Sequence, residues 1–362
     1  MVLGAMTRII VCCDGLAPSY LETVDTPSLD AIGDAGRAGT CDAAIPSLTN
    51  VNNVSIATGG PPSHHGITGN TYYDRETDEL VYMKDPEYLR ATSKFEAAVN
   101  DGASVGALVA KEKLERMIGQ GCTIAASAES PPAWLESAVG PAPDIYSGAA
   151  SRWLLRAADA TLDAYDLDWL YVSTTDVVPH KHPPDDPAAT KWVRDLDAGI
   201  AQLHRRARDI AITADHGMSA KTTCLDLETF LTEAGFETTV VRLIRDAHTY
   251  HHQNLGGAAY VYIHDDQQPA AACAAIEELT EVDLALTGTD AADMFSLPAD
   301  RIGDVLALGS GSTVFGPLDE GVTGSVELRS HGSHFEQEVP YRISRDVDLD
   351  ANYELFNVLA AA

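Results

Sequence analysis

Three aspartates of this 362-residue chain stand where short apolar runs end. Asp14 closes RIIVCC, Asp176 follows WLYVS through two threonines, and Asp215 follows DIAIT through one alanine. Ligands of open α/β sheets bind beyond the carboxyl ends of the strands, so these carboxylates are expected to converge there. Three carboxylates at one sheet edge repel one another unless a cation lies between them, and a metal ion is the simplest such cation.

Histidines stand near the same strand ends. His180 follows Asp176 by four residues, so the two side chains share a face if a helical turn begins there. His216 directly follows Asp215, and His331 lies in RSHGSHFEQ near the C-terminus. Mixed carboxylate and imidazole ligands suit zinc or a similar ion better than calcium or magnesium. A single Asp-His-Gly also makes a good turn, so the predicted metal site depends on the whole set.

Thr49 is the candidate nucleophile. It precedes a predicted helix over 50–57, so its hydroxyl would lie near the positive end of the helix dipole. A threonine hydroxyl is a poor nucleophile at neutral pH, but coordination to zinc would lower its pKa and make the alkoxide accessible. By itself, Thr49 or Asn50 would be interpreted as a plain helix cap.

Lys111 and Lys113 are two of only seven lysines, and they directly follow a strand-like run at 104–110. If the extended backbone continued to residue 113, their spacing of two would direct both side chains toward one anionic ligand. The alternative is a solvated helix start, KEKLER, with ordinary ion pairs.

The elements that must position these residues alternate between strand-like runs and helical periodicity. This alternation predicts an α/β fold with a central, mostly parallel sheet and helices on both faces. Helices are expected over 151–165 and 187–206. After residue 220 the chain shows few matching strand–helix units, so residues 223–324 are predicted to form a smaller inserted cap domain. Residues 1–222 and 325–362 would then form the metal-binding core.

The composition limits the function classes. Acidic residues number 54 against 24 basic ones, a net charge of −30, which argues against binding nucleic acid or an anionic membrane. An excess of acidic residues together with few lysines is typical of a halophilic protein, which stays soluble in concentrated salt. The six cysteines form no CxxC pair and are expected to be free thiols. No apolar run or leader pattern predicts a membrane span or a signal peptide, so a cytoplasmic location is expected.

Several motifs together resemble the alkaline phosphatase superfamily, in its nucleotide pyrophosphatase/phosphodiesterase-like branch: Asp14, PSLTN, HGITGN, STTD with its trailing His180, ADHGM and RSHG. Within it the match is closest to the family of phosphonoacetate hydrolases. The segments that narrow it are PSLTNVNNVSIATGGPPSHHGITGNTYYD, where Ile45 precedes in place of the pattern's valine, DPEYLRA and AKEKL. The resemblance covers about 6–130, 165–220 and 325–342 and is faint across the predicted insertion.

The resemblance implies an alkaline-phosphatase-like fold and a role for each matching residue. Thr49 would be the nucleophile, Asn70 would donate to a phosphoryl oxygen, and Lys111 and Lys113 would grip the substrate carboxylate. Two zinc ions would be bound, one by Asp14, Thr49, Asp215 and His216, the other by Asp176, His180 and His331. His334 competes with His331 for the last position, and His331 is preferred because SHG is the matching tripeptide.

The implied activity is zinc-dependent hydrolysis of the P–C bond of phosphonoacetate to acetate and phosphate through a phosphothreonine intermediate. Breaking a P–C bond expels a carbanion that survives only as the enolate of acetate, so cations at the carboxylate would stabilise the transition state. A phosphodiesterase or phosphomonoesterase of the same superfamily is the alternative, and a non-catalytic metal-binding protein is a third. The partner would be a small anionic phosphonate, and both a monomer and a homodimer are compatible with the sequence.

Two pairs of adjacent histidines have more than one interpretation. His64 and His65 lie in a Pro/Gly-rich loop and are expected to serve a turn or rim rather than a metal. His251 and His252 could reach over the site from the insertion, and on a strand at most one of them would face it.

Overall fold

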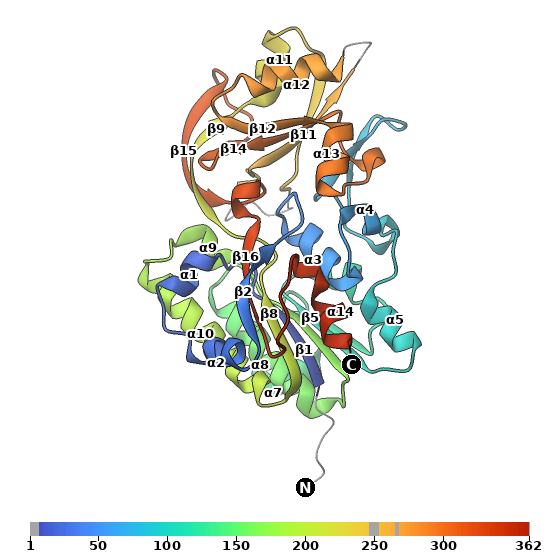
Figure 1. The fold of residues 1–362 in the computed structure, drawn as a ribbon, viewed down its shortest axis with the longest axis vertical. Helices are drawn as coiled ribbons and strands as arrows, with labels where there is room; N and C mark the ends of the chain where they lie inside the picture. The colour runs from blue at the N-terminus through green and yellow to red at the C-terminus, as the bar shows by residue number, and fades with distance from the viewer. Residues whose placement is uncertain (1–6, 246–252, 265–267, 362) are drawn as a thin grey trace.

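The computed structural model describes residues 7–245, 253–264 and 268–361. Its lower half in Figure 1 is built on a seven-stranded sheet with the order β2-β16-β8-β1-β7-β5-β6. Neighbouring strands are parallel except at β16, which is antiparallel to both β2 and β8. The strands are β1 (Thr7–Cys12), β2 (Arg37–Asp42), β5 (Val105–Val109), β6 (Ile124–Ser127), β7 (Trp169–Ser173), β8 (Ala207–Thr213) and β16 (Glu338–Ile343). This is the predicted mostly parallel sheet of an alkaline-phosphatase-like fold.

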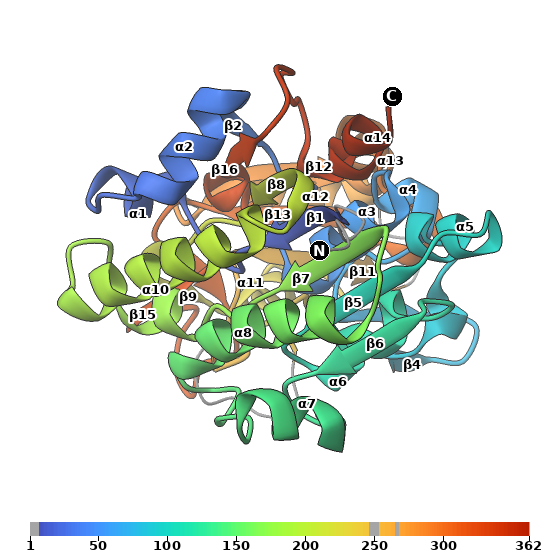
Figure 2. The same cartoon turned by 90° about the horizontal axis from the view of Figure 1, so that it is seen from below.

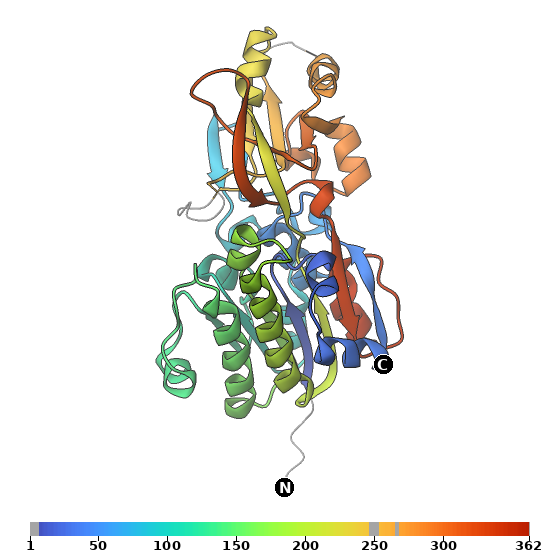
Figure 3. The same ribbon diagram turned by 90° about the vertical axis from the view of Figure 1, so that its left-hand side faces the viewer.

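Helices cover both faces of the sheet, as Figures 2 and 3 show. One face carries α2 (Pro27–Ala35), α7 (Ala133–Val139), α8 (Ala149–Ala164) and α10 (Pro187–His204), and the other carries α3 (Thr49–Thr58), α5 (Lys94–Asn100) and α14 (Leu355–Ala360). The helices predicted over 151–165 and 187–206 are confirmed as α8 and α10. Asp186 caps α10 by accepting a hydrogen bond from the backbone N–H of Ala188, and Pro187 occupies the first turn.

Four short helices connect these layers: α1 (Pro18–Glu22), α4 (Pro62–His65), α6 (Glu112–Ile118) and α9 (Val177–Lys181). A two-stranded hairpin, β3 (Thr71–Asp74) and β4 (Glu79–Tyr82), follows α4. No helix in the described part of the chain is both long and apolar enough to cross a membrane.

A second, smaller sheet lies above the first in Figure 1. It is antiparallel, with the order β10-β11-β13-β12, and α11, α12 and α13 pack against it. The elements are β10 (Thr238–Arg242), β11 (Ala258–Ile263), β12 (Val282–Thr287), β13 (Val305–Gly309), α11 (Leu227–Glu233), α12 (Pro269–Glu277) and α13 (Gly288–Phe295). The expectation of few regular units in this region was therefore wrong.

The two faces of the smaller sheet belong to different cores. Along β11, Ala259 and Val261 join the apolar cluster under α11 and α12, whereas Tyr260 and Tyr262 join the main core. The alternation follows from the pleat, which sends successive side chains to opposite faces. The smaller sheet is thus packed onto the main body along one whole face.

Two adjacent antiparallel strands carry the chain into this upper region and back. β9 (Ser219–Leu225) leads away from the Asp215 segment, and β15 (Thr323–Ser330) returns to His331, with β14 (Thr313–Phe315) on the other side of β9. The boundaries of the inserted cap at 222/223 and 324/325 fall inside β9 and β15. The division into two domains stays a prediction.

Candidate active site

The three aspartates converge at the carboxyl end of the central sheet. β1 lies between β7 and β8, so Asp14, Asp176 and Asp215 leave three neighbouring strands at the same edge. The backbone N–H of Gly15 donates to Asp215 Oδ1 over 3.2 Å. A Cβ at Gly15, whose φ is +73°, would lie 2.9 Å from the Cβ of Asp176. Glycine after Asp14 therefore lets the strand ends approach closely, which explains why a buried strand runs into Asp-Gly.

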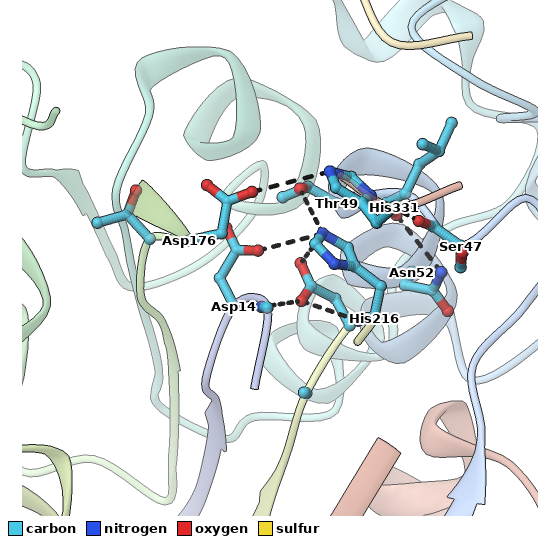
Figure 4. Close-up of polar contacts among 12 residues, drawn as sticks. Asp14, Ser47, Thr49, Asn52, Asp176, His216 and His331 are labelled. Carbon is cyan, nitrogen blue, oxygen red and sulfur yellow. Dashed lines mark hydrogen bonds and ion pairs between the residues drawn. The ribbon is translucent and has the colours of Figure 1, made fainter. Parts of the chain in front are cut away.

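Three histidines complete the cluster, and Figure 4 shows two of them, His216 and His331, beside Asp14 and Asp176. Asp176 is the N-cap residue of α9, and His180 lies one turn later with Nε2 at 2.9 Å from Asp176 Oδ2. His216 and His331 stack, with ring centroids 3.5 Å apart and an interplanar angle of 5°. Their proximity follows from the strand register, since Ser219 of β9 pairs with Ser330 of β15 and each histidine stands just outside that pair.

Backbone carbonyls fix the tautomers of all three imidazoles. Nδ1 of His180 lies 2.7 Å from the oxygen of Arg329, Nδ1 of His216 2.8 Å from that of Gly217, and Nδ1 of His331 2.8 Å from that of Ser47. A carbonyl oxygen only accepts hydrogen bonds, so each Nδ1 must carry a proton and donate it. Each Nε2 therefore faces the aspartates as the ligand atom, which is the arrangement typical of metal-binding histidines.

The electrostatics of the cluster favour a cation among the carboxylates. Burial raises the pKa of Asp14, and the neighbouring Asp176 and Asp215 raise it further. Burial lowers the pKa of His216, but Asp215, Asp14 and Asp176 outweigh burial and raise that pKa to about 10. For His331, burial and the nearby His216 and His180 lower the pKa well below its usual value. Positive charge is thus stabilised next to His216, between the aspartates.

The donor atoms form two candidate buried metal sites, as expected for a binuclear centre typical of this superfamily. In each group the ligand atoms lie within 4.8 Å of one another: Asp176, His180 and His331 form one, and Asp14, Asp176 and His216 form the other. Asp176 is common to both groups. Asp215 lies behind the second group, with Oδ2 at 3.9 Å from His216 Nε2.

Thr49 lies against this cluster at the start of α3. Its Oγ1 is 3.2 Å from His216 Nε2, and Figure 4 shows the hydroxyl beside His216 and His331. Thr49 is the first residue of α3 rather than the residue before it, and Leu48 occupies the N-cap position without a capping side chain. The interpretation of Thr49 or Asn50 as a plain helix cap is therefore wrong. Asn50 instead donates through Nδ2 to Asn70 Oδ1 over 2.7 Å.

Asn53 connects this helix to the metal-ligand cluster and was missed from the sequence. Its Nδ2 donates to Asp215 Oδ2 over 3.0 Å and to the carbonyl of Thr49 over 2.9 Å, while its Oδ1 accepts from the Tyr171 hydroxyl over 2.6 Å. All these groups are buried except Thr49, which is half-buried. The available signal was the presence of three asparagines in one short helix, since a buried amide must be hydrogen-bonded.

Lys111 and Lys113 line the same cavity as Asp14, Thr49 and Asp176, a space of about 40 Å³. The extended backbone expected as far as residue 113 is wrong, because β5 ends at Val109 and α6 begins at Glu112. Lys111 is the N-cap residue of α6 and Lys113 lies in its first turn. The helix-start alternative describes the backbone correctly, yet both side chains reach the cavity because the N-terminus of α6 lies at the sheet edge.

Of the other candidate site residues, Asn70 lies at the cavity, whereas His334 and His65 do not. Asn70 lines the cavity, and its Nδ2 donates to the carbonyl of Arg245 over 2.9 Å. His334 lies apart from the cluster, with Nε2 at 3.0 Å from Asp283 Oδ2. His65 is fully buried between Ser55 and the backbone N–H of Ile67, so it has a structural role. The residues 251 and 252 lie outside the described part of the chain. All six cysteines are free, as expected.

The fold and the site together define a metallohydrolase-like α/β protein of the alkaline phosphatase superfamily. The family model of type I phosphodiesterase / nucleotide pyrophosphatase matches residues 8–334, and the chain belongs to this family. It is similar to phosphonoacetate hydrolase from Sinorhizobium meliloti 1021, solved in complex with phosphonoacetate and with phosphonoformate. The identity is 33%, the TM-score is 0.91, and the match covers 99% of this chain and 97% of that one.

More distant relatives share the fold. Murine ectonucleotide pyrophosphatase / phosphodiesterase 5, in its inactive form with AMP, has 15% identity and a TM-score of 0.71, and the match covers 98% of this chain and 94% of that one. Human ectonucleotide pyrophosphatase/phosphodiesterase family member 7 is 25% identical over 233 residues, 58% of this chain and 47% of that protein. The chain thus matches only about half the length of that curated relative.

Proposed function

We propose that this protein hydrolyses the P–C bond of phosphonoacetate to acetate and phosphate, using two zinc ions and a phosphothreonine intermediate. The observation that carries the proposal is the joint presence of Thr49, the aspartate–histidine cluster and two lysines in one small cavity. The cavity is small, about 40 Å³.

The donor set fits divalent cations of the zinc type, because it combines carboxylates with imidazoles already fixed in the metal-binding tautomer. We infer the following ligands: Asp14, Thr49, Asp215 and His216 for one ion, and Asp176, His180 and His331 for the other. When bound, such ions supply Lewis-acid activation of an oxygen nucleophile and neutralise charge on a phosphoryl group.

Each of these side chains would then have its own role in the reaction. Thr49 Oγ1 attacks phosphorus, the O–P bond forms as the P–C bond breaks, and the electron pair of that bond passes to the departing carbon. The pair delocalises into the carboxylate as an enolate, which Lys111 and Lys113 stabilise by their charge. Proton uptake from water gives acetate, and hydrolysis of the phosphothreonine releases phosphate and restores Thr49.

Asn70 would orient the phosphoryl group. Its amide is held by Asn50 on one side and by the Arg245 carbonyl on the other. A carboxamide nitrogen has two N–H donors, so one bond to Arg245 is compatible with a second to a phosphoryl oxygen. The fixed orientation would align phosphorus with Thr49.

Phosphate release from phosphonoacetate by zinc-loaded protein tests the proposal. The Thr49→Ala variant should still bind zinc but release no phosphate above background, and Thr92→Ala, on a connecting segment outside the cavity, serves as the control. Zinc-loaded wild-type protein that releases no phosphate from phosphonoacetate would refute the assignment. Unchanged turnover in Thr49→Ala would remove the nucleophile and the phosphothreonine with it.

A phosphodiesterase or phosphomonoesterase is the second candidate, favoured by the match of the family model over residues 8–334. p-Nitrophenyl phosphate and bis(p-nitrophenyl) phosphate, assayed beside phosphonoacetate, separate these activities. An alkoxide leaving group needs no cation at a substrate carboxylate. Lys113→Ala should therefore lower kcat/KM for phosphonoacetate much more than for the two esters.

We also infer that the protein works in a salt-rich cytoplasm. The support is the net charge of −30 with only seven lysines, since concentrated salt screens the self-repulsion of such a chain. Recovery of fold after denaturation should improve between low salt and molar KCl. Equal recovery in both would contradict the inference.

A further inference from the structure

The hairpin of β3 and β4 begins and ends at the candidate active site. Asn70 immediately precedes β3, and Tyr82 ends β4, where it pairs with Thr71. The backbone N–H of Met83 donates to the carbonyl of Asn70 over 2.9 Å, which closes the base of the hairpin. Both Thr71 and Met83 are buried, so the base of the hairpin is a fixed part of the site.

Contacts with the smaller sheet also hold the hairpin. The rings of Tyr73 and Tyr262 pack edge to face with centroids 5.2 Å apart, and the backbone N–H of Tyr73 donates to the Tyr262 hydroxyl over 3.3 Å. The guanidinium of Arg301 lies 5.7 Å from the centroid of Tyr72. Side chains on both faces of β3 are therefore anchored, and Tyr82 is presented by a braced element.

Tyr82 contacts Lys113 in two ways. Nζ of Lys113 donates to the Tyr82 hydroxyl oxygen over 2.8 Å and lies 4.9 Å from the centroid of the same ring. A hydrogen bond to an ammonium is stronger than one between neutral groups, and attraction by the ring face adds to it. Because a lysine side chain has four flexible carbons, these contacts select one placement of its charge in the cavity wall.

We infer that Tyr82 is a positioning residue that sets the preference of the site for phosphonates bearing a carboxylate, an inference that rests on the proposed function. Tyr82 does not line the cavity itself and acts through Lys113, which does. An ammonium has three N–H donors, so a bond to Tyr82 is compatible with another to a ligand carboxylate. Fixing the ammonium before the ligand arrives lowers the entropy cost of binding.

The test measures binding, so that it does not depend on turnover. In a zinc-loaded Thr49→Ala background, isothermal titration calorimetry compares phosphonoacetate with methylphosphonate, which lacks the carboxylate. Adding Tyr82→Phe removes the hydroxyl but keeps the ring. We expect the Kd of phosphonoacetate to rise by about tenfold, the effect of a lost hydrogen bond to a charged group, and that of methylphosphonate by less than about twofold.

Two further variants separate positioning from a general structural effect. Tyr73→Phe is the matched control, because its hydroxyl bonds to Asp78 at the exposed end of the same hairpin, and it should leave both Kd values unchanged. In a Lys113→Ala background, Tyr82→Phe should have no further effect on phosphonoacetate.

The inference is overturned if Tyr82→Phe weakens both ligands equally, or if its effect persists without Lys113. It is also overturned if the background protein binds phosphonoacetate no better than methylphosphonate. Failure of the proposed function has a different signature, namely no phosphate release from phosphonoacetate by the wild-type enzyme, whatever the binding constants.

Discussion

Lys221 forms a completely buried ion pair whose loss should destabilise the protein strongly. Its Nζ lies 2.9 Å from Glu336 Oε1 and 3.1 Å from the carbonyl of Gly311, and neither charged side chain is exposed to solvent. Glu336 also joins two ligand segments, since its backbone carbonyl accepts from Gly217 and its Oε2 accepts from Ser333. Glu336 therefore connects the segments that carry His216 and His331.

Lys221→Met keeps the apolar stem but leaves the Glu336 carboxylate buried without its cation. Breaking a buried pair on one side costs about 3–5 kcal/mol, and we expect about 3 because Ser333 and Ser219 still donate to this carboxylate. Replacing both partners, as in Lys221→Met/Glu336→Gln, removes the uncompensated charge. The double variant should lose less than half of what the single variant loses.

Urea unfolding of the zinc-free proteins at constant KCl, followed by far-UV circular dichroism, measures these differences if the m-values agree. Lys191→Met is the control, because its pair with Asp195 lies on the surface of α10 and should contribute about 0–1 kcal/mol. Equal losses in the single and double variants would refute the reasoning, since packing of the lysine stem and not the buried charge would then dominate.

Three further predictions concern other parts of the molecule. Burial lowers the pKa of His65 to about 3, so below about pH 6.5 the unfolded chain takes up a proton at this residue and the folded protein does not. The contribution of His65 to stability is therefore complete above about pH 6.5 and is lost by up to about 1.4 kcal/mol per unit as the pH falls further. In urea unfolding of the zinc-free proteins, His65→Gln should reduce the loss of stability between about pH 6.5 and 5, whereas His64→Gln should leave it unchanged. Asn53→Ala removes the hydrogen-bond donor to Asp215 and should weaken zinc binding about 10–100-fold in a chelator competition. The control Asn100→Ala should bind zinc as the wild type does, and equal affinities of the two variants would contradict the role of Asn53. Finally, kcat/KM for phosphonoacetate should rise with ionic strength because screening weakens the repulsion between an anionic substrate and a chain of charge −30, and a flat or falling profile would contradict it.

The convergence of the aspartates was predictable because it depends on one rule of chain geometry. Parallel strands end at the same edge of a sheet, so the types and endings of three apolar runs were sufficient to place Asp14, Asp176 and Asp215 together. Similarly, His180 needed only the spacing of a helical turn. Local periodicity and sheet topology thus account for this half of the cluster.

The pairing of His216 with His331 could not be derived from local patterns. It depends on the antiparallel register of β9 and β15, two strands separated by the whole upper region. Strand pairing over such a distance leaves no spacing signal, and only the resemblance of the SHG tripeptide to the superfamily pointed to His331. Asn53 was missed for a related reason, because its partners Asp215 and Tyr171 come from two different strands.

Lys111 and Lys113 line the cavity although the local structure differs from the one expected. Extended backbone would have directed Lys111 and Lys113 to one face by their spacing of two, but the chain turns into α6 at Glu112. The N-cap residue and the first turn of a helix both lie at its N-terminal end, so their side chains can reach the same space when that end abuts a cavity. Position at the sheet edge, rather than periodicity, therefore places both lysines at the cavity that Asp14 and Asp176 also line.

That placement bears on which bond the site can break. In the proposed reaction, attack on phosphorus by Thr49 would expel the group on the opposite side, and the required stabilisation depends on where the departing electron pair goes. For an ester the charge stays on the oxygen next to phosphorus, beside the aspartate–histidine cluster. For phosphonoacetate it would move two atoms further, into the carboxylate, away from the phosphoryl group that ions held by the aspartate–histidine cluster would contact. Lys113, which lines the same cavity and donates to Tyr82, would supply the additional charge stabilisation that the proposed cleavage of a P–C bond requires beyond that of a phosphate ester.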